Sequence, residues 1–198
     1  METPREVGIA HLTLLDVSPP DLVLVAWAAG FDSIGVRVRV ATRGEEPWPM
    51  APGSPLLKET ALRLADTGIQ VLDIENVAIQ PGLTRSDYEV ALESGARLGA
   101  RYLIVNSADP DLERTADTFA AITEAARLYG IRPVIEPMAF KEVRSLRQAV
   151  RVAERAGGGV LIDSLHFQRC GETFETLAQL DPDLLPYVQI CDALLTIR

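Results

Sequence analysis

The acidic and imidazole side chains that could do chemistry follow short apolar runs in the second half of the sequence. Residues 160–162 form one such run, which ends at Asp163, and His166 follows three residues later. Glu136 ends a similar apolar run. A carboxylate at the end of a buried parallel strand is where α/β folds place their catalytic groups. These residues therefore predict a chemical site built from strand ends.

Each expected strand carries one polar residue near its carboxyl end, and all of these residues share one face. Side chains alternate between the two faces of a strand, so in a closed barrel such residues would point into the interior and meet at its top. The set comprises His11, Arg37, Glu75, Asn106, Glu136, Asp163 and Gln189. For the first four of these, substrate contact and a structural ion-pair or supporting role are both open.

The elements that must position these residues alternate along the whole chain. Short β-branched runs are followed by amphipathic helical segments, which is the pattern of a parallel sheet covered by helices. The expected strands are residues 7–12, 33–40, 70–77, 102–107, 132–136, 160–163 and 187–191. The expected helices are about residues 19–30, 56–67, 84–99, 110–130, 142–156 and 174–180.

This order of elements predicts an α/β fold with a TIM-barrel-like parallel (β/α) barrel. A Rossmann-like open sheet would need a Gly-rich turn after an early strand, whereas the only glycine cluster, residues 157–159, precedes a strand. Seven strands are readable and the eighth strand is missing before Arg198, so we expect a barrel that is incomplete at its C-terminus. Two chains are then expected to associate as a homo-oligomer that covers the open barrel edge.

Composition limits the class of protein. The 198 residues fit one domain, residues 1–198, and a net charge of −9 argues against a nucleic-acid partner. No apolar run is long enough to span a membrane, and the N-terminus lacks the layout of a signal peptide, so a cytoplasmic protein without a membrane partner is expected. Cys170 and Cys191 lack a CxxC spacing and are expected to be two reduced thiols.

A family resemblance rests on four segments taken in order: AHLTLLDVSP near the start, VIEP at Glu136, LIDSLHF at Asp163 and His166, and VQICDA at Gln189. Together they resemble the sugar phosphate isomerase/epimerase group of the xylose-isomerase-like TIM barrels, over essentially the whole chain. The resemblance implies that Glu136, Asp163 and Gln189 bind a divalent metal ion. Oxygen ligands suit Mn²⁺ or Mg²⁺, with Co²⁺ or Zn²⁺ as alternatives.

The same resemblance implies the remaining roles. His166 would contact the substrate and take part in catalysis, and Arg169 is a candidate for holding an anionic substrate. Glu136 is the candidate base for proton transfer beside a carbonyl of a sugar, keto-sugar or sugar phosphate. A metal-dependent dehydratase acting on a dehydroshikimate- or inosose-like keto-polyol is an alternative, because Gln189 resembles the residue that some dehydratases use. The alternative that is not an enzyme is a truncated, non-catalytic remnant.

Overall fold

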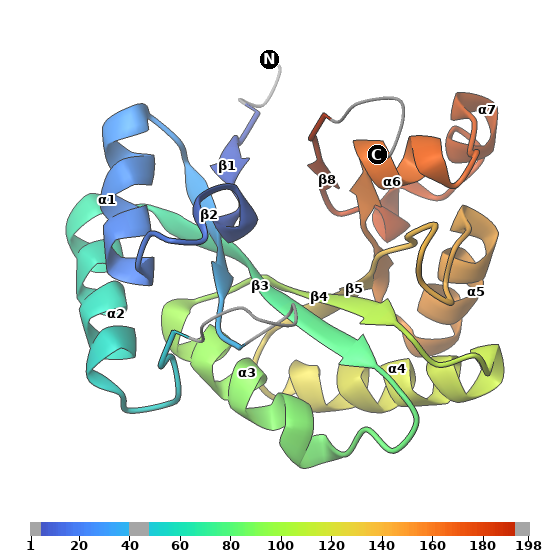
Figure 1. Cartoon of the computed structure of the whole chain (residues 1–198), viewed down its shortest axis with the longest axis horizontal. Helices are drawn as coiled ribbons and strands as arrows, with labels where there is room; N and C mark the ends of the chain where they lie inside the picture. Colours follow the sequence, from blue (N-terminus) through green and yellow to red (C-terminus); the bar gives the residue numbers. More distant parts are fainter. Residues whose placement is uncertain (1–4, 40–47, 193–198) are drawn as a thin grey trace. The chain divides into compact units, whose positions relative to one another are not determined.

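The computed structural model describes residues 5–39 and 48–192, in which strands and helices alternate (Figure 1). The strands are β1 (Gly8–Ile9), β2 (Ser33–Arg37), β3 (Gln70–Ile79), β4 (Tyr102–Ser107), β5 (Arg132–Ile135), β6 (Gly159–Val160), β7 (Ile162–Asp163) and β8 (Val188–Gln189). The first six form one sheet in chain order, and β7 pairs with β8 in a second sheet. β1 with β2, β2 with β3, β5 with β6 and β7 with β8 are parallel pairs, as the alternating pattern predicts.

The helices lie between these strands. They are the 3₁₀ turn η1 (His11–Leu14), α1 (Pro19–Ala29), α2 (Pro55–Thr67), α3 (Arg85–Leu98), α4 (Leu112–Arg127), α5 (Leu146–Ala156), α6 (Ser164–Arg169), α7 (Phe174–Leu177) and the 3₁₀ turn η2 (Pro182–Leu184). Within the described ranges, none of these helices has the length and apolar character that crossing a membrane requires.

Local capping chemistry sets where several helices begin and end. The Ser18 hydroxyl accepts a hydrogen bond from the backbone N–H of Asp21, and α1 begins at Pro19, whose missing N–H costs nothing at a helix start. Gly30 closes the same helix with a φ of 80°, a left-handed conformation that glycine adopts without strain. Thr84 and Asp87 form a reciprocal capping box at the start of α3.

The chain packs as two compact units. The first comprises the described parts of residues 1–77, 84–103 and 126–131. Its core contains Leu22, Ile34, Ile74 and Leu92, all fully buried. Helices α1 and α2 lie side by side in this unit, and α1 also packs against β2 (Figure 1).

The second unit comprises the described parts of residues 78–83, 104–125 and 132–198. Its core contains the fully buried side chains of Phe119, Ile135, Leu146 and Leu161. Helix α5 packs against β5 and β6. This unit carries the carboxyl ends of β4, β5, β7 and β8, where the sequence analysis places most of the chemistry.

The first three expected strands differ from those observed, and the last is shorter, Val188–Gln189 in place of residues 187–191. The first strand is only Gly8–Ile9, and His11 lies in the η1 turn, not at a strand end. Strand β3 runs on to Ile79, so Glu75 lies inside the strand. The second strand ends at Arg37, and residue 40 lies outside the described residues.

The region around Asp163 also differs from the expectation. The expected sixth strand is divided into β6 and β7, because β6 pairs with β5 whereas β7 pairs with β8. Helix α6 follows Asp163 directly and was not expected. Helix α5 begins at Leu146, later than predicted, because the Ser145 hydroxyl caps it and the N–H of Glu142 is bound by the Ser107 carbonyl.

Candidate functional site

Glu136 and Asn106 lie beside each other in the second unit. The backbone N–H of Glu136 donates to the Val105 carbonyl at 2.9 Å, which is the hydrogen bond that pairs Glu136 with Asn106 in a parallel ladder. Paired residues of neighbouring strands present their side chains on the same face. Both side chains are buried, with 5% exposure for Glu136 and 3% for Asn106, and the Asn106 Oδ1 atom has no hydrogen-bond partner.

Asp163 and Gln189 form a second pair in the same unit. They lie opposite each other at the carboxyl ends of β7 and β8. Asp163 is 7% exposed, and its Oδ1 atom accepts a hydrogen bond from the backbone N–H of His166 at 2.9 Å. Asp163 is therefore the N-cap of α6 and has a structural role at the start of this helix. Gln189 is partly buried.

His166 lies between the acidic groups and an exposed aromatic ring. Its Nε2 atom is 3.9 Å from Oε1 of Glu136, too far for a hydrogen bond, and its ring meets that of Phe140 edge to face with centroids 5.4 Å apart. Burial lowers the pKa of His166, Arg169 acts in the same direction, and Asp163 opposes them. The neutral imidazole that results can both donate and accept a hydrogen bond, and its buried Nδ1 atom has no partner.

A cysteine that the sequence analysis gave no role also contacts Asp163. The Sγ atom of Cys191 is 3.1 Å from Oδ2 and 3.5 Å from Oδ1 of Asp163, and the thiol donates to the carboxylate. Burial raises the pKa of Cys191, and the hydrogen bond to Asp163 and the charge of Glu136 raise it further. The group is therefore a protonated thiol. The sequence could have indicated this contact, because Cys191 follows Gln189 by two residues and side chains two apart on a strand lie on the same face.

The donor chemistry of this cluster, which we call the carboxylate cluster (Asn106, Glu136, Asp163, Gln189), fits a divalent cation. It offers two buried carboxylates and two amide oxygens, one of which lacks a partner. Within the described residues, however, no three histidine, cysteine, aspartate or glutamate side chains are already gathered closely enough to hold a metal ion.

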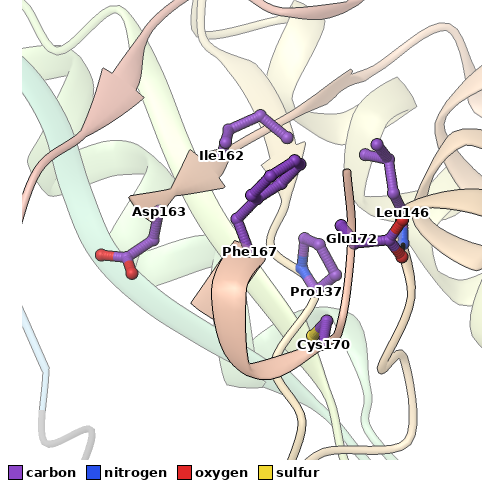
Figure 2. A pocket seen from close by; sticks show the side chains of 7 residues that line it. All are labelled: Pro137, Leu146, Ile162, Asp163, Phe167, Cys170 and Glu172. Carbon is purple, nitrogen blue, oxygen red and sulfur yellow. Dashed lines mark hydrogen bonds between the residues drawn. The ribbon is translucent and has the colours of Figure 1, made fainter. Parts of the chain in front are cut away.

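A small apolar hollow lies on the other side of Asp163. Figure 2 shows the Asp163 carboxylate turned away from the other side chains that line it. The hollow is lined by Pro137, Leu146, Ile162, Asp163, Phe167, Cys170 and Glu172. Asp163 is the only member of the carboxylate cluster among these lining residues. Arg169, the candidate for holding an anionic substrate, is exposed at the last residue of α6.

In the first unit, His11, Arg37 and Glu75 form a connected group. The Nδ1 atom of His11 accepts from the backbone N–H of Arg37 at 3.0 Å, and Nε2 lies 2.9 Å from the Val17 carbonyl, to which it donates. The Arg37 Nε donates to Oε2 of Glu75 at 2.9 Å, and both side chains are 6% exposed. These three residues hold η1 and the strands together, and both ring nitrogens of His11 are used within the protein.

The same group includes an aspartate that the sequence analysis did not select. Asp73 is 2% exposed and lies two residues before Glu75 on β3, on the same face. A Cβ atom at Gly35 would lie 2.6 Å from Oδ1 of Asp73 and 3.2 Å from Oε1 of Glu75. A side chain at position 35 would therefore displace the Asp73 carboxylate, which lies close to the Gly35 backbone. The Oε1 atom of Glu75 has no hydrogen-bond partner.

Solved structures similar to this chain share its fold. The IolI protein with a bound zinc atom is 18% identical, with a TM-score of 0.79 over 94% of this chain and 72% of that one. The 3-keto-D-glucoside 4-epimerase YcjR from E. coli is 15% identical, with a TM-score of 0.75 over 96% and 80%. The probable 3-DHS dehydratase AsbF from Bacillus anthracis is 15% identical, with a TM-score of 0.72 over 93% and 72%.

At such identities the structural likeness shows the fold alone. No curated protein gives a significant sequence match to the chain. A family model does match, over residues 23–196, and its description is a xylose isomerase-like TIM barrel. That match covers most of the 198 residues and all of the carboxylate cluster. The chain therefore belongs to the xylose isomerase-like TIM barrel family.

Proposed function

We propose that this protein is a metal-dependent isomerase or epimerase of a sugar, keto-sugar or sugar phosphate. The observation that carries the proposal is the pair of buried carboxylates, Glu136 and Asp163, at strand ends beside an orphan amide oxygen of Asn106. Oxygen atoms of carboxylates and amides are the ligands that hard divalent ions prefer. Family membership and the epimerase among the structural neighbours support the same reaction class.

Glu136, Asp163 and Gln189 would hold the ion. Their oxygen atoms alone favour Mn²⁺ or Mg²⁺, with Co²⁺ or Zn²⁺ as alternatives, and a neighbour with bound zinc supports a divalent ion in this fold. When bound, such an ion polarises a substrate carbonyl or hydroxyl oxygen and stabilises the negative charge that develops on it.

The chain's own residues would move the proton. The Glu136 carboxylate takes a proton from the carbon next to the carbonyl and, in an isomerisation, delivers it to the neighbouring carbon, and its burial excludes competing water. An epimerisation also needs a proton donor on the opposite face of the carbon. The imidazole of His166, kept neutral by burial, donates a hydrogen bond to a substrate hydroxyl or accepts one from it. His11, Arg37 and Glu75 act in our proposal as a rigid support, and Arg169 offers a positive charge to an anionic substrate.

A dehydratase that uses the same site is the second candidate. Gln189 stands at the seventh-strand position, and the probable 3-DHS dehydratase among the structural neighbours supports this reading. Both reactions begin with removal of a proton beside a carbonyl. They differ in the product, because the dehydratase expels a hydroxyl group as water.

The test is a substrate screen of the metal-loaded protein. Ketoses, keto-glucosides, inososes and dehydroshikimate would each be incubated with the protein and Mn²⁺, and the products separated by chiral chromatography. We expect an epimer or isomer from a keto-sugar, and no product from Glu136→Gln. A product that has lost water would favour the dehydratase. No conversion of any compound would favour a binding protein without catalysis.

A further inference from the structure

The two histidines of the chain are held in different ways. Both ring nitrogens of His11 form hydrogen bonds within the protein, one with the Arg37 N–H and one with the Val17 carbonyl. Within the described residues, the imidazole of His166 forms none: its buried Nδ1 atom has no partner, and its Nε2 atom is 3.9 Å from Oε1 of Glu136. Most buried polar side-chain atoms have a partner in the protein, so the unbound ring of His166 indicates a group available to another molecule.

The backbone of His166 is fixed, but this does not fix the imidazole. The N–H of His166 donates to Oδ1 of Asp163 at 2.9 Å, and its carbonyl accepts from the N–H of Cys170 at 2.8 Å. A histidine whose ring forms no hydrogen bond can still rotate about χ1 and χ2. Another contact must therefore select the rotamer that places the ring beside Glu136.

Phe140 supplies such a contact. Its ring meets that of His166 edge to face, with the centroids 5.4 Å apart and the planes at 69°. Aromatic pairs prefer this arrangement, at centroid separations of about 4.5–7 Å. Packing of this kind restricts the rotation of the imidazole and occupies neither of its nitrogen atoms.

The loop that carries Phe140 is itself held in place. The N–H of Met138 donates to the Val143 carbonyl at 3.0 Å, which closes the loop, and both of these side chains are buried. Phe140 lies between them in the sequence and is 67% exposed. The ring therefore contributes little to the core, and its contact with His166 is made from an anchored backbone.

We propose that Phe140 is a positioning residue of the site: its ring, and not a hydrogen bond, holds the His166 imidazole beside Glu136 and leaves Nε2 free to bind the substrate. The inference rests on the proposed function for the role of His166 and deepens it, because it names the residue that sets the orientation of this group. The orientation itself can be measured without any substrate.

Nuclear magnetic resonance of the free protein tests the positioning. The chain has only two histidines, so the imidazole signals of His166 can be resolved and those of His11 serve as an internal reference. Three-bond couplings about χ1 and relaxation of the ring Cδ2–H bond report whether an imidazole keeps one conformation. We expect one conformation of His166 in the parent and in Phe140→Tyr, averaging between rotamers in Phe140→Ala, and an unchanged His11 in all three.

Two further variants control this experiment. Phe174→Ala removes another exposed phenylalanine ring of the same unit and should leave both histidines unchanged. Phe140→Leu keeps apolar bulk without a ring, and it replaces Phe140→Ala if that variant does not keep the circular dichroism spectrum of the parent. Because Phe140 is largely exposed, we expect its variants to keep nearly the Tm of the parent.

Deuterium exchange at the carbon beside a keto-sugar carbonyl gives a readout that a merely structural contact would not move. Misplacement of a catalytic group by about 1 Å can cost about 100-fold in rate, so Phe140→Ala should lower kcat about 10- to 100-fold and change KM less. Phe140→Tyr should restore kcat. Because Phe140 acts through His166, adding Phe140→Ala to His166→Ala should cause no further loss.

The outcomes separate this inference from the proposed function. A His166 ring that is already averaged in the parent, or that stays as ordered in Phe140→Ala, would overturn the role of Phe140 and leave the proposed function standing. A double variant in which the losses of the two single variants add would overturn it in the same way. If no keto-sugar exchanges in the parent with any metal ion, the proposed function is wrong, and the resonance experiment still decides whether Phe140 positions the imidazole.

Discussion

Replacement of Asp163 separates its structural role from its proposed role in metal binding. Asp163→Ala removes the N-cap of α6, which is worth about 1 kcal/mol, and the acceptor of the Cys191 thiol, a further hydrogen bond of about 1 kcal/mol. The free energy of unfolding should therefore fall by about 2 kcal/mol. For a chain of this size, that corresponds to a fall in Tm of about 4–8 °C.

Asp163→Asn is the matched control. Asparagine caps helices about as well as aspartate, and its amide oxygen can keep the hydrogen bond from the His166 N–H. The amide nitrogen in place of Oδ2 loses the shorter bond from the Cys191 thiol, so the free energy of unfolding should fall by about 1 kcal/mol. Its neutral amide is, however, a much weaker ligand, so affinity for a divalent ion should fall severalfold in both variants. Thermal unfolding followed by circular dichroism and metal titration by calorimetry measure the two effects. Equal destabilisation by both substitutions would show that the charge of Asp163, not its capping oxygen, stabilises this region.

Three further predictions concern stability. Glu75→Gln removes the negative charge from the buried Arg37–Glu75 ion pair and should lower the free energy of unfolding in urea by about 3–5 kcal/mol; a loss below about 1 kcal/mol would contradict the role of this pair. Gly158→Ala places a Cβ 2.6 Å from a buried phenylalanine ring and 3.0 Å from a backbone carbonyl, so it should cost about 1–3 kcal/mol, and an unchanged Tm would refute this packing. The hydrogen bond from Arg114 lowers the pKa of Asp109 below 3.8, so the pair stabilises the fold above that pH and its contribution is lost as the pH falls through the lowered value. The Tm difference between the parent and Asp109→Asn should consequently shrink on acidification, and a constant difference would refute the linkage.

Features that depend on neighbouring residues in the sequence were predictable. The caps of α1 and α3 follow from Ser18, Pro19 and the pairing of Thr84 with Asp87, because these interactions span three residues. The order of the strands followed from the alternation of apolar runs with helical segments, and the family followed from the resemblance of four segments taken in order. Once the strand ends are known, parallel pairing also predicts which of their residues are neighbours. These pairs are Asn106 with Glu136 and Asp163 with Gln189.

Features that depend on contacts between distant residues were not predictable. His11 lies in a turn because its ring binds the Arg37 N–H and the Val17 carbonyl, and no local pattern signals such a bond. The contact of Cys191 with Asp163 depends on Ser164, which joins two segments 27 residues apart. A cysteine without a metal-binding spacing gave no reason to expect this contact.

Proton exchange at the carbon beside the carbonyl tests the central claim most directly. The protein would be incubated in D₂O with Mn²⁺ or Zn²⁺ and each keto-sugar of the panel, and deuterium incorporation followed by NMR. We predict incorporation at that carbon that requires the metal, is abolished in Glu136→Gln and persists in Glu172→Gln, a carboxylate outside the carboxylate cluster. Incorporation that is equal in the parent and in Glu136→Gln, or that is absent with every keto-sugar and metal, would contradict the proposed function.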